Sequence, residues 1–201
     1  MPLLFDMSLE DLQTYMGTNP KPDDFDSYWD QGLQEVQSID PEIKLVRSTF
    51  QTPTIDCFDM YFTGVGGARI HSKILRPNEV EEPHPAVLVF HGYKGSSGDW
   101  SDHLGLAAAG STVAALDCRG QGGLSEDVGS IRGNTFRGHI IRGLDDSPEK
   151  LLFRQIFLDA AQLARIVMEM AEVNPNRIGA TGRSQGGGLR AGRVSQGFKK
   201  I

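Results

Sequence analysis

Short apolar runs of strand length alternate with helical patterns through much of this 201-residue chain, and this alternation limits the possible folds more than any other feature. Residues 86–90 and 112–117 are continuous runs of the kind that is buried on both faces of a parallel sheet. A helix-compatible segment, residues 100–109, lies between them, and residues 149–173 carry apolar side chains at helical spacing. Residues 177–181 form the next strand-like run. This order is typical of an α/β domain.

Two helices and an antiparallel set of strands are predicted ahead of this region. Ser8 begins a capping box, and an apolar stripe from Phe25 to Val36 predicts a second helix. β-branched and aromatic residues then gather in three short runs, with residues 64–67 as a Gly-rich hairpin turn. These predicted strands are residues 43–50, 55–63 and 69–75. Residues 118–148 are rich in Gly, Asp and Arg without periodicity, and we expect a long functional loop or lid there.

The pentapeptide Gly182-Arg-Ser-Gln-Gly186 directly follows the last predicted strand. A G-x-S-x-G sequence in this position is typical of a serine nucleophile on a sharp strand-to-helix elbow, which makes Ser184 the predicted nucleophile. Gly182 and Gly186 support the site because a side chain there would clash with the neighbouring strand and helix. The backbone N–H of Gln185 is predicted to donate to an oxyanion hole. Since the chain holds 24 glycines, a structural Gly-rich helix entry is the alternative interpretation.

The loop that follows residues 86–90 is predicted to supply the second donor of the oxyanion hole. It reads His91-Gly-Tyr-Lys-Gly-Ser-Ser-Gly98, and the backbone N–H of Tyr93 is the candidate donor. A simple turn that uses glycine for its backbone freedom is the alternative. We expect His91 to be a structural loop residue, because the catalytic base of this type of hydrolase follows the last strand.

A third loop begins at Asp117, at the carboxyl end of a predicted parallel strand, and should therefore face the same crevice as Ser184. Arg119 is predicted to support the site by bracing this loop or the elbow with fork-like hydrogen bonds to carbonyls, and a solvated arginine is the alternative. Gly120, Gly122 and Ser125 do not form a dinucleotide-binding fingerprint, since no helical pattern opens there.

Composition excludes several other classes of function. The chain has 26 acidic and 20 basic residues, a net charge of −6, which argues against a nucleic-acid partner. No apolar run approaches the roughly 20 residues that a membrane span needs. The N-terminus lacks the basic region of a secretory signal, so we expect a cytoplasmic protein. No metal-ligand cluster is visible, and neither a metal nor another cofactor is predicted.

Four motifs occur in an order that resembles one enzyme family. They are His91-Gly-Tyr-Lys-Gly-Ser-Ser-Gly-Asp-Trp100, Arg119-Gly-Gln-Gly-Gly123, Gly138-His-Ile-Ile-Arg-Gly-Leu-Asp-Asp146 and Gly182-Arg-Ser-Gln-Gly-Gly187. The chain resembles the acetyl xylan esterases and cephalosporin C deacetylases of carbohydrate esterase family 7, which are α/β-hydrolases. The resemblance implies removal of acetyl groups from short xylo-oligosaccharides and cephalosporin-type esters, with Ser184 as nucleophile and Tyr93 and Gln185 at the oxyanion hole. It also implies no cofactor and a homo-oligomer, usually a hexamer.

Three features depart from the family's pattern. The family's catalytic Asp and its His-Glu motif lie far downstream of the elbow, whereas residues 185–201 contain no Asp, Glu or His. Arg183 stands where the family carries a small residue or proline. Residues 190–201 form an atypical tail with four basic residues in place of an apolar helix.

From these departures we expect a single incomplete domain over residues 1–201. Its fold would be an α/β-hydrolase truncated after the elbow strand, with an N-terminal extension of helices and antiparallel strands. Such a chain is expected to be inactive by itself, because the nucleophile lacks its base. The alternative is a non-catalytic remnant that keeps only binding or oligomer contacts.

Overall fold

The computed structural model describes residues 7–78, 80–81, 83–128 and 141–191. The chain divides into two compact units, residues 1–31 and 32–201. In the first unit, helix α1 (Leu9–Thr14) is capped by Ser8, whose Oγ accepts a hydrogen bond from the Asp11 N–H at 3.1 Å. Helix α2 (Phe25–Ser38) begins in the first unit and ends in the second. Both predicted N-terminal helices are therefore confirmed.

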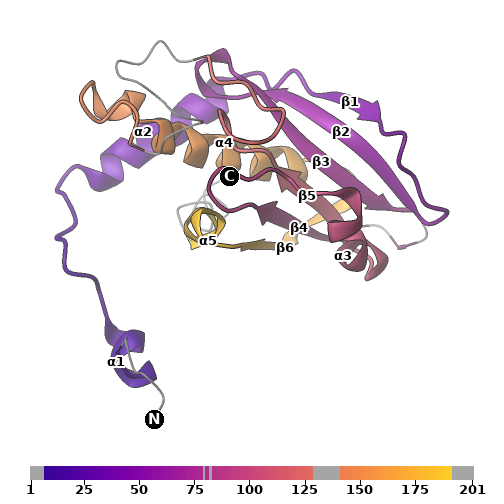
Figure 1. Cartoon of the computed structure of the whole chain (residues 1–201), viewed down its shortest axis with the longest axis horizontal. Helices are drawn as coiled ribbons and strands as arrows, with labels where there is room; N and C mark the ends of the chain where they lie inside the picture. Colours follow the sequence, from indigo (N-terminus) through magenta and orange to yellow (C-terminus); the bar gives the residue numbers. More distant parts are fainter. Residues whose placement is uncertain (1–6, 79, 82, 129–140, 192–201) are drawn as a thin grey trace. The chain divides into compact units, whose positions relative to one another are not determined.

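A six-stranded mixed sheet forms the centre of the second unit (Figure 1). Its strands are β1 (Lys44–Arg47), β2 (Ile55–Thr63), β3 (Arg69–Pro77), β4 (His84–Phe90), β5 (Thr112–Leu116) and β6 (Val173–Gly182). Their order is β1-β2-β3-β5-β4-β6, in which β1, β2, β3 and β5 pair antiparallel and β4 pairs parallel with both β5 and β6. The predicted antiparallel extension and the parallel core are both confirmed.

Helices cover both faces of this sheet. α4 and α5 contribute to one apolar cluster, while Ala107 of α3 belongs to the cluster on the opposite face. No helix among the described residues is both long enough and apolar enough to cross a membrane. The helices that cover the two faces of the sheet are α3 (Leu104–Ala108), α4 (Leu152–Met168) and α5 (Gln185–Ala191).

The two clusters follow from the alternation of side chains along each strand. In β2, Ile55 and Cys57 belong to the cluster on the α3 side, while Met60 and Phe62 belong to the cluster on the α4 side. The two pairs occupy odd and even positions, which point to opposite faces of a pleated strand. β2 is therefore buried on one face along its first half and on the other face along its second half.

Two predicted helices differ from the observed ones. Residues 100–109 form a 3-10 helix, η2 (Trp100–His103), that continues as α3. The helix predicted over residues 149–173 ends at Met168, and Val173 already pairs with His84 as the first residue of β6. The helical prediction was wrong there because Pro175 cannot continue a helix, and the residues before it are recruited into the sheet.

The predicted long loop contains no helix or strand in residues 118–128 and 141–147, and its last residue, Pro148, begins the 3-10 helix η3 (Pro148–Lys150). The rest of that segment, including the start of the Gly138–Asp146 motif, lies outside the described residues, as does the atypical tail beyond residue 191. The structure of residues 118–125 depends on two buried ionic anchors rather than on a regular element.

The first anchor is a buried ion pair between Arg119 and Asp159 of α4. Both side chains are about 1% exposed, and the guanidinium contacts the carboxylate through two hydrogen bonds of 2.6 Å. Arg119 also donates to the Gln155 side chain and to the carbonyl of Val65, each at 2.9 Å. Gly64 leaves room for this pair, because a Cβ there would collide with Asp159.

The second anchor is the carboxylate of Asp117, directly after β5. It accepts hydrogen bonds from the backbone N–H groups of Ser97 and Leu124 and from Nδ1 of His71. Burial raises the pKa of Asp117, but the hydrogen bonds from His71, Leu124 and Ser97 outweigh it and hold the pKa at about 2, below its ordinary 3.8.

The Arg119–Asp159 pair generates a stability prediction. Asp159→Leu leaves the guanidinium buried without its counter-ion and should lower the free energy of unfolding by about 3–5 kcal/mol. The double variant Arg119→Met with Asp159→Leu removes both charges. Its free energy of unfolding should fall clearly less than that of Asp159→Leu alone. Urea unfolding of the two variants and the wild type measures this, and a double variant less stable than the single one would contradict it.

Asp117 generates a prediction on pH. Its folded pKa lies below the ordinary value, so its stabilisation is complete above the unfolded pKa and is lost as the pH falls through the folded pKa. From about pH 4 to about pH 2 this residue should therefore cost the chain about 2 kcal/mol of unfolding free energy. Urea unfolding across this range should show a shallower decline in Asp117→Asn, and equal slopes in both proteins would refute the assignment.

Candidate active site

Ser184 occupies the turn between the last residue of β6 and the first residue of α5. Its φ is +55°, a left-handed backbone conformation that a non-glycine residue rarely adopts. The side chain is exposed, and α5 begins at once, with Gly187 and Gly188 donating to the Ser184 carbonyl at 2.8 and 3.2 Å. This is the backbone geometry of a nucleophile elbow, at the position that the sequence predicts.

Two glycines allow the elbow to pack against the carboxyl end of β4. A Cβ on Gly186 would collide with the carbonyl of Phe90 and lie 3.0 Å from the carbonyl of His91. A Cβ on Gly182 would collide with the carbonyl of Gly186 and lie 2.8 Å from that of Phe90. The atoms in the way belong to the neighbouring strand and helix, which agrees with the steric reason inferred from the sequence.

The loop after β4, residues 91–98, lies directly beside this elbow. A Cβ added to Gly92 would be 3.5 Å from the carbonyl oxygen of Arg183 and 3.7 Å from Cβ of Ser184. Arg183 itself is exposed, so its side chain projects from the surface.

The two backbone groups that the sequence assigns to the oxyanion hole have no acceptor among the described residues. Neither the N–H of Tyr93 nor the N–H of Gln185 donates a hydrogen bond there, while the next amide along the loop, that of Lys94, is satisfied by Gln121. Unpaired N–H groups at a helix start and in an adjacent loop are suited to binding a negatively charged oxygen.

Gln121 connects the two sides of the site and was not predicted. Its Oε1 accepts the Lys94 N–H at 2.8 Å, and its Nε2 donates to Oε1 of Gln185 at 2.9 Å. The loop that carries it, residues 117–125, is pressed onto the 91–98 loop, because a Cβ on Gly122 would lie 2.7 Å from the Lys94 carbonyl. Gln121 belongs to the Arg119–Gly123 motif, but nothing in the sequence indicated its contacts, since its two partners are far away in the sequence.

His91 and Cys118 hold the 91–98 and 117–125 loops together and are not reactive groups. Nε2 of His91 accepts the Cys118 N–H at 2.9 Å, so Nδ1 carries the proton that is donated to the Gly92 carbonyl at 2.7 Å. A histidine with its lone pair occupied in this way cannot take a proton from serine, in agreement with the structural role expected for it. Burial raises the pKa of the Cys118 thiol far above its ordinary value, so it stays a thiol.

Arg119 lies beneath the site rather than in it. The side chain is almost fully buried and points to Asp159 and to the Val65 carbonyl. It therefore braces the 117–125 loop through a carboxylate and one carbonyl, where the sequence argument had considered carbonyls alone, and it is not solvated.

No described histidine is hydrogen-bonded to Ser184. His71 and His91 use both ring nitrogens elsewhere, His84 contacts Thr112, and His103 contacts the Ser97 carbonyl. Among the same residues, no group of three or more His, Cys, Asp or Glu side chains could hold a metal ion. The described part of the chain thus presents Ser184 on a sharp turn beside two backbone N–H groups that have no acceptor there.

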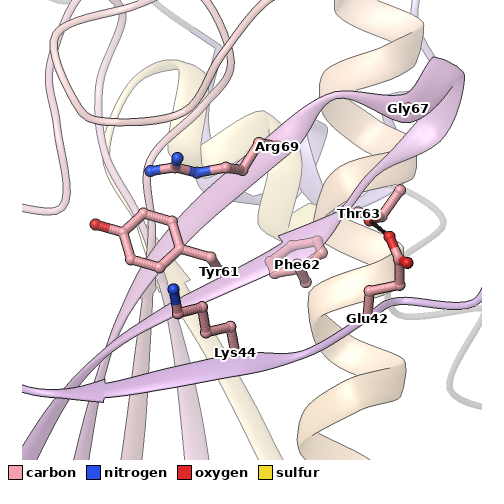
Figure 2. A pocket seen from close by; sticks show the side chains of 7 residues that line it. All are labelled: Glu42, Lys44, Tyr61, Phe62, Thr63, Gly67 and Arg69. Atoms are coloured by element: carbon pink, nitrogen blue, oxygen red, sulfur yellow. Dashed lines mark hydrogen bonds between the residues drawn. The ribbon is translucent and has the colours of Figure 1, made fainter.

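A separate hollow of about 540 Å³ lies on β1, β2 and β3. Figure 2 shows the Tyr61 ring between the side chains of Lys44 and Arg69. Nearby, the Thr63 hydroxyl donates a hydrogen bond to the Glu42 carboxylate at 3.0 Å. The Arg69 guanidinium lies 4.3 Å from the centre of the Tyr61 ring. None of the predicted site residues lines this hollow.

The chain is similar to solved acetyl xylan esterases. It is 58% identical to acetyl xylan esterase 1 from Thermoanaerobacterium sp. JW/SL YS485, with a TM-score of 0.87 over 92% of this chain and 58% of that one. It is 30% identical to the acetyl xylan esterase from Paenibacillus sp. R4, with a TM-score of 0.81 over 91% of this chain and 58% of that one. The chain thus spans somewhat less than two thirds of the length of these relatives.

These likenesses agree with the sheet order and the elbow geometry, and they identify the fold as that of the α/β-hydrolases. The family model for acetyl xylan esterase (AXE1) matches residues 1–197, which is nearly the whole chain. The chain therefore belongs to the acetyl xylan esterase family.

Proposed function

We propose that this chain carries the nucleophile and the oxyanion hole of a serine esterase that removes acetyl groups from carbohydrates. The observation that carries the proposal is the elbow. Ser184 has a left-handed backbone and an exposed side chain, and it lies beside two N–H groups that have no acceptor among the described residues. Membership of the acetyl xylan esterase family supports the choice of acetyl esters.

The proposed reaction proceeds through an acetylated serine. Oγ of Ser184 attacks the acetyl carbonyl carbon, and the carbonyl oxygen becomes negatively charged in the tetrahedral intermediate. The N–H groups of Tyr93 and Gln185 donate to that oxygen. The intermediate expels the sugar hydroxyl, and water then releases acetate and restores the serine.

The base that takes the serine proton lies outside the described residues in this proposal. The described histidines are engaged with other groups, and the relatives extend well beyond the region that this chain matches. We infer that residues 1–201 by themselves hydrolyse esters very slowly. Loss of the catalytic triad costs on the order of a million-fold in kcat in subtilisin, and the residual catalysis comes from the oxyanion hole and binding.

The substrates proposed are acetylated xylo-oligosaccharides, in keeping with the name of the relatives, and acetyl esters of cephalosporin type. The second class and a homo-hexameric assembly rest on the family resemblance alone. The cytoplasmic location rests on the N-terminal composition, which lacks the basic region of a secretory signal. No cofactor takes part in the proposed chemistry.

A chimera tests the proposed function. Residues 1–189 of this chain are joined to the downstream segment of the relative that is 58% identical, which supplies the missing part of the fold. We expect Ser184-dependent hydrolysis of p-nitrophenyl acetate and of acetylated xylo-oligosaccharides by the chimera. Residues 1–201 alone should act at a rate close to that of their own Ser184→Ala variant.

Ser184→Ala in the chimera is the matched control, since it removes the attacking oxygen and leaves almost no cavity. A folded chimera that hydrolyses the ester equally well with and without the Ser184 hydroxyl would refute the nucleophile assignment. A folded chimera without any activity would favour the alternative, a remnant with binding contacts only.

The elbow glycines give a second prediction for the same chimera. Gly186→Ala places a methyl group against the Phe90 carbonyl, so the turn must open and activity should fall at least about a hundredfold, the scale of losing one oxyanion donor. Gly188→Ala is the control, because its Cβ meets nothing within 4 Å and alanine favours a helix by up to about 1 kcal/mol. Equal activity of the two variants would show that the close approach at Gly186 is not needed.

A further inference from the structure

The buried carboxylate of Asp117 connects the two loops beside Ser184, residues 91–98 and 117–125. Its Oδ1 accepts the Ser97 N–H from the 91–98 loop at 2.5 Å, and its Oδ2 accepts the Leu124 N–H from the 117–125 loop at 2.8 Å. The side chain is about 2% exposed. A single buried carboxylate thus fixes the backbone of both loops.

His71 of β3 holds this carboxylate in place. Nδ1 of His71 lies 2.7 Å from Asp117 Oδ2, and Nε2 lies 2.9 Å from Oδ1 of Asp59. Each ring nitrogen of His71 thus faces a carboxylate oxygen, so both polar edges of the ring are engaged. Asp59 is 27% exposed and forms the end of this row that water reaches.

The same row is not a catalytic Asp-His pair. Both ring nitrogens of His71 contact carboxylates, so neither is directed at Ser184. The backbone on either side reinforces the arrangement, since the His71 N–H donates to Ser125 Oγ at 2.8 Å and that hydroxyl donates to the Asp117 carbonyl at 2.6 Å. The contacts of Asp117 therefore concern the geometry of the loops.

The two N–H groups of the proposed oxyanion hole, those of Tyr93 and Gln185, are connected to the Asp117 carboxylate through hydrogen bonds of the two loops. Ser97 closes the loop that carries Tyr93, and the Gly122 N–H donates to the Gly95 carbonyl of the same loop at 2.9 Å. Leu124 fixes the loop that carries Gln121, which contacts the Gln185 side chain. Loops rich in Gly and Ser have little apolar surface to pack, so these hydrogen bonds restrain them together with the Arg119–Asp159 ion pair.

We propose that Asp117, held by His71 and Asp59, is a positioning residue that fixes the two loops of the oxyanion hole beside Ser184. The catalytic consequence of this role rests on the proposed esterase function. The fixed conformation of the two loops rests on the contacts of Asp117 themselves. Charged groups near the row are Lys73, which is opposite Asp59 in the sheet and donates to the Gly98 carbonyl, and Arg69, which stacks on Tyr61 beside the His71 ring.

Amide hydrogen exchange on the 201-residue chain tests the order of the loops without any need for activity. In Asp117→Asn, peptides within residues 91–98 and 117–125 should exchange about tenfold faster or more, as expected when a hydrogen bond to a charged acceptor is lost. Exchange in α4 should not change. Asp56→Asn is the matched control, since Asp56 lies on β2 near Asp59 but forms its ion pair, among the described residues, with Arg47 on the surface.

Unchanged exchange of both loops in Asp117→Asn would overturn the proposal. If α4 also lost its protection, the milder variant Asp59→Asn decides. Faster exchange confined to the two loops in Asp59→Asn supports the proposal. Unchanged exchange of both loops in that variant refutes it.

Kinetics of the chimera test the catalytic consequence. Asp117→Asn should lower kcat about ten- to a hundredfold with little change in KM, because an oxyanion hole acts on the transition state. A rise in KM alone would overturn the positioning role. A chimera without Ser184-dependent activity would refute the proposed function and leave the exchange result standing.

Discussion

The candidate site depends on a contact between backbones at the carboxyl end of β4. Gly182 and Gly186 have no side chain where the carbonyl of Phe90 approaches, so the end of β6 and the start of α5 close on β4 as tightly as a peptide backbone allows. This closeness places Ser184 beside Gly92, at a turn where the serine has a positive φ of 55°. The strained conformation is therefore a consequence of packing that the rest of the sheet supports.

Different forces hold the layers and the loops of this protein. The sheet and its helices are held by apolar clusters on both faces, in which the side chains alternate along each strand. The loops above the sheet contain mainly Gly, Ser and polar residues, and buried ionic groups at Asp117 and Arg119 restrain them from below. A buried ion pair such as Arg119 with Asp159 contributes little net stability compared with an apolar pair, but its hydrogen bonds restrict the position of the loop that carries Arg119.

The sequence predicted those parts of the structure that short-range patterns encode. Strands and helices followed from periodicity, and the elbow followed from Gly182, Ser184 and Gly186, whose spacing reflects one local turn. The row of Asp59, His71 and Asp117 escaped notice because its members lie on two strands and a loop, and each looks ordinary in its own segment. The position of Asp117 at the carboxyl end of a parallel strand was the one feature of the sequence that could have indicated its role near the site. Gln121 lies in the Arg119–Gly123 motif, but the motif did not indicate its contacts with Lys94 and Gln185.

The pairing of β4 with β6 has a consequence for the order in which the protein folds. His84 pairs with Val173, so the whole of β5, both site loops and α4 must be enclosed before these strands can align. Parallel pairing across such a separation is slow, because the entropy of closing a long segment is lost before any contact compensates for it. The local strands β1, β2 and β3 can form early, whereas β6 joins late. Ser184, at the end of β6, would thus acquire its reactive geometry in one of the last steps of folding, when the surrounding loops are already in place.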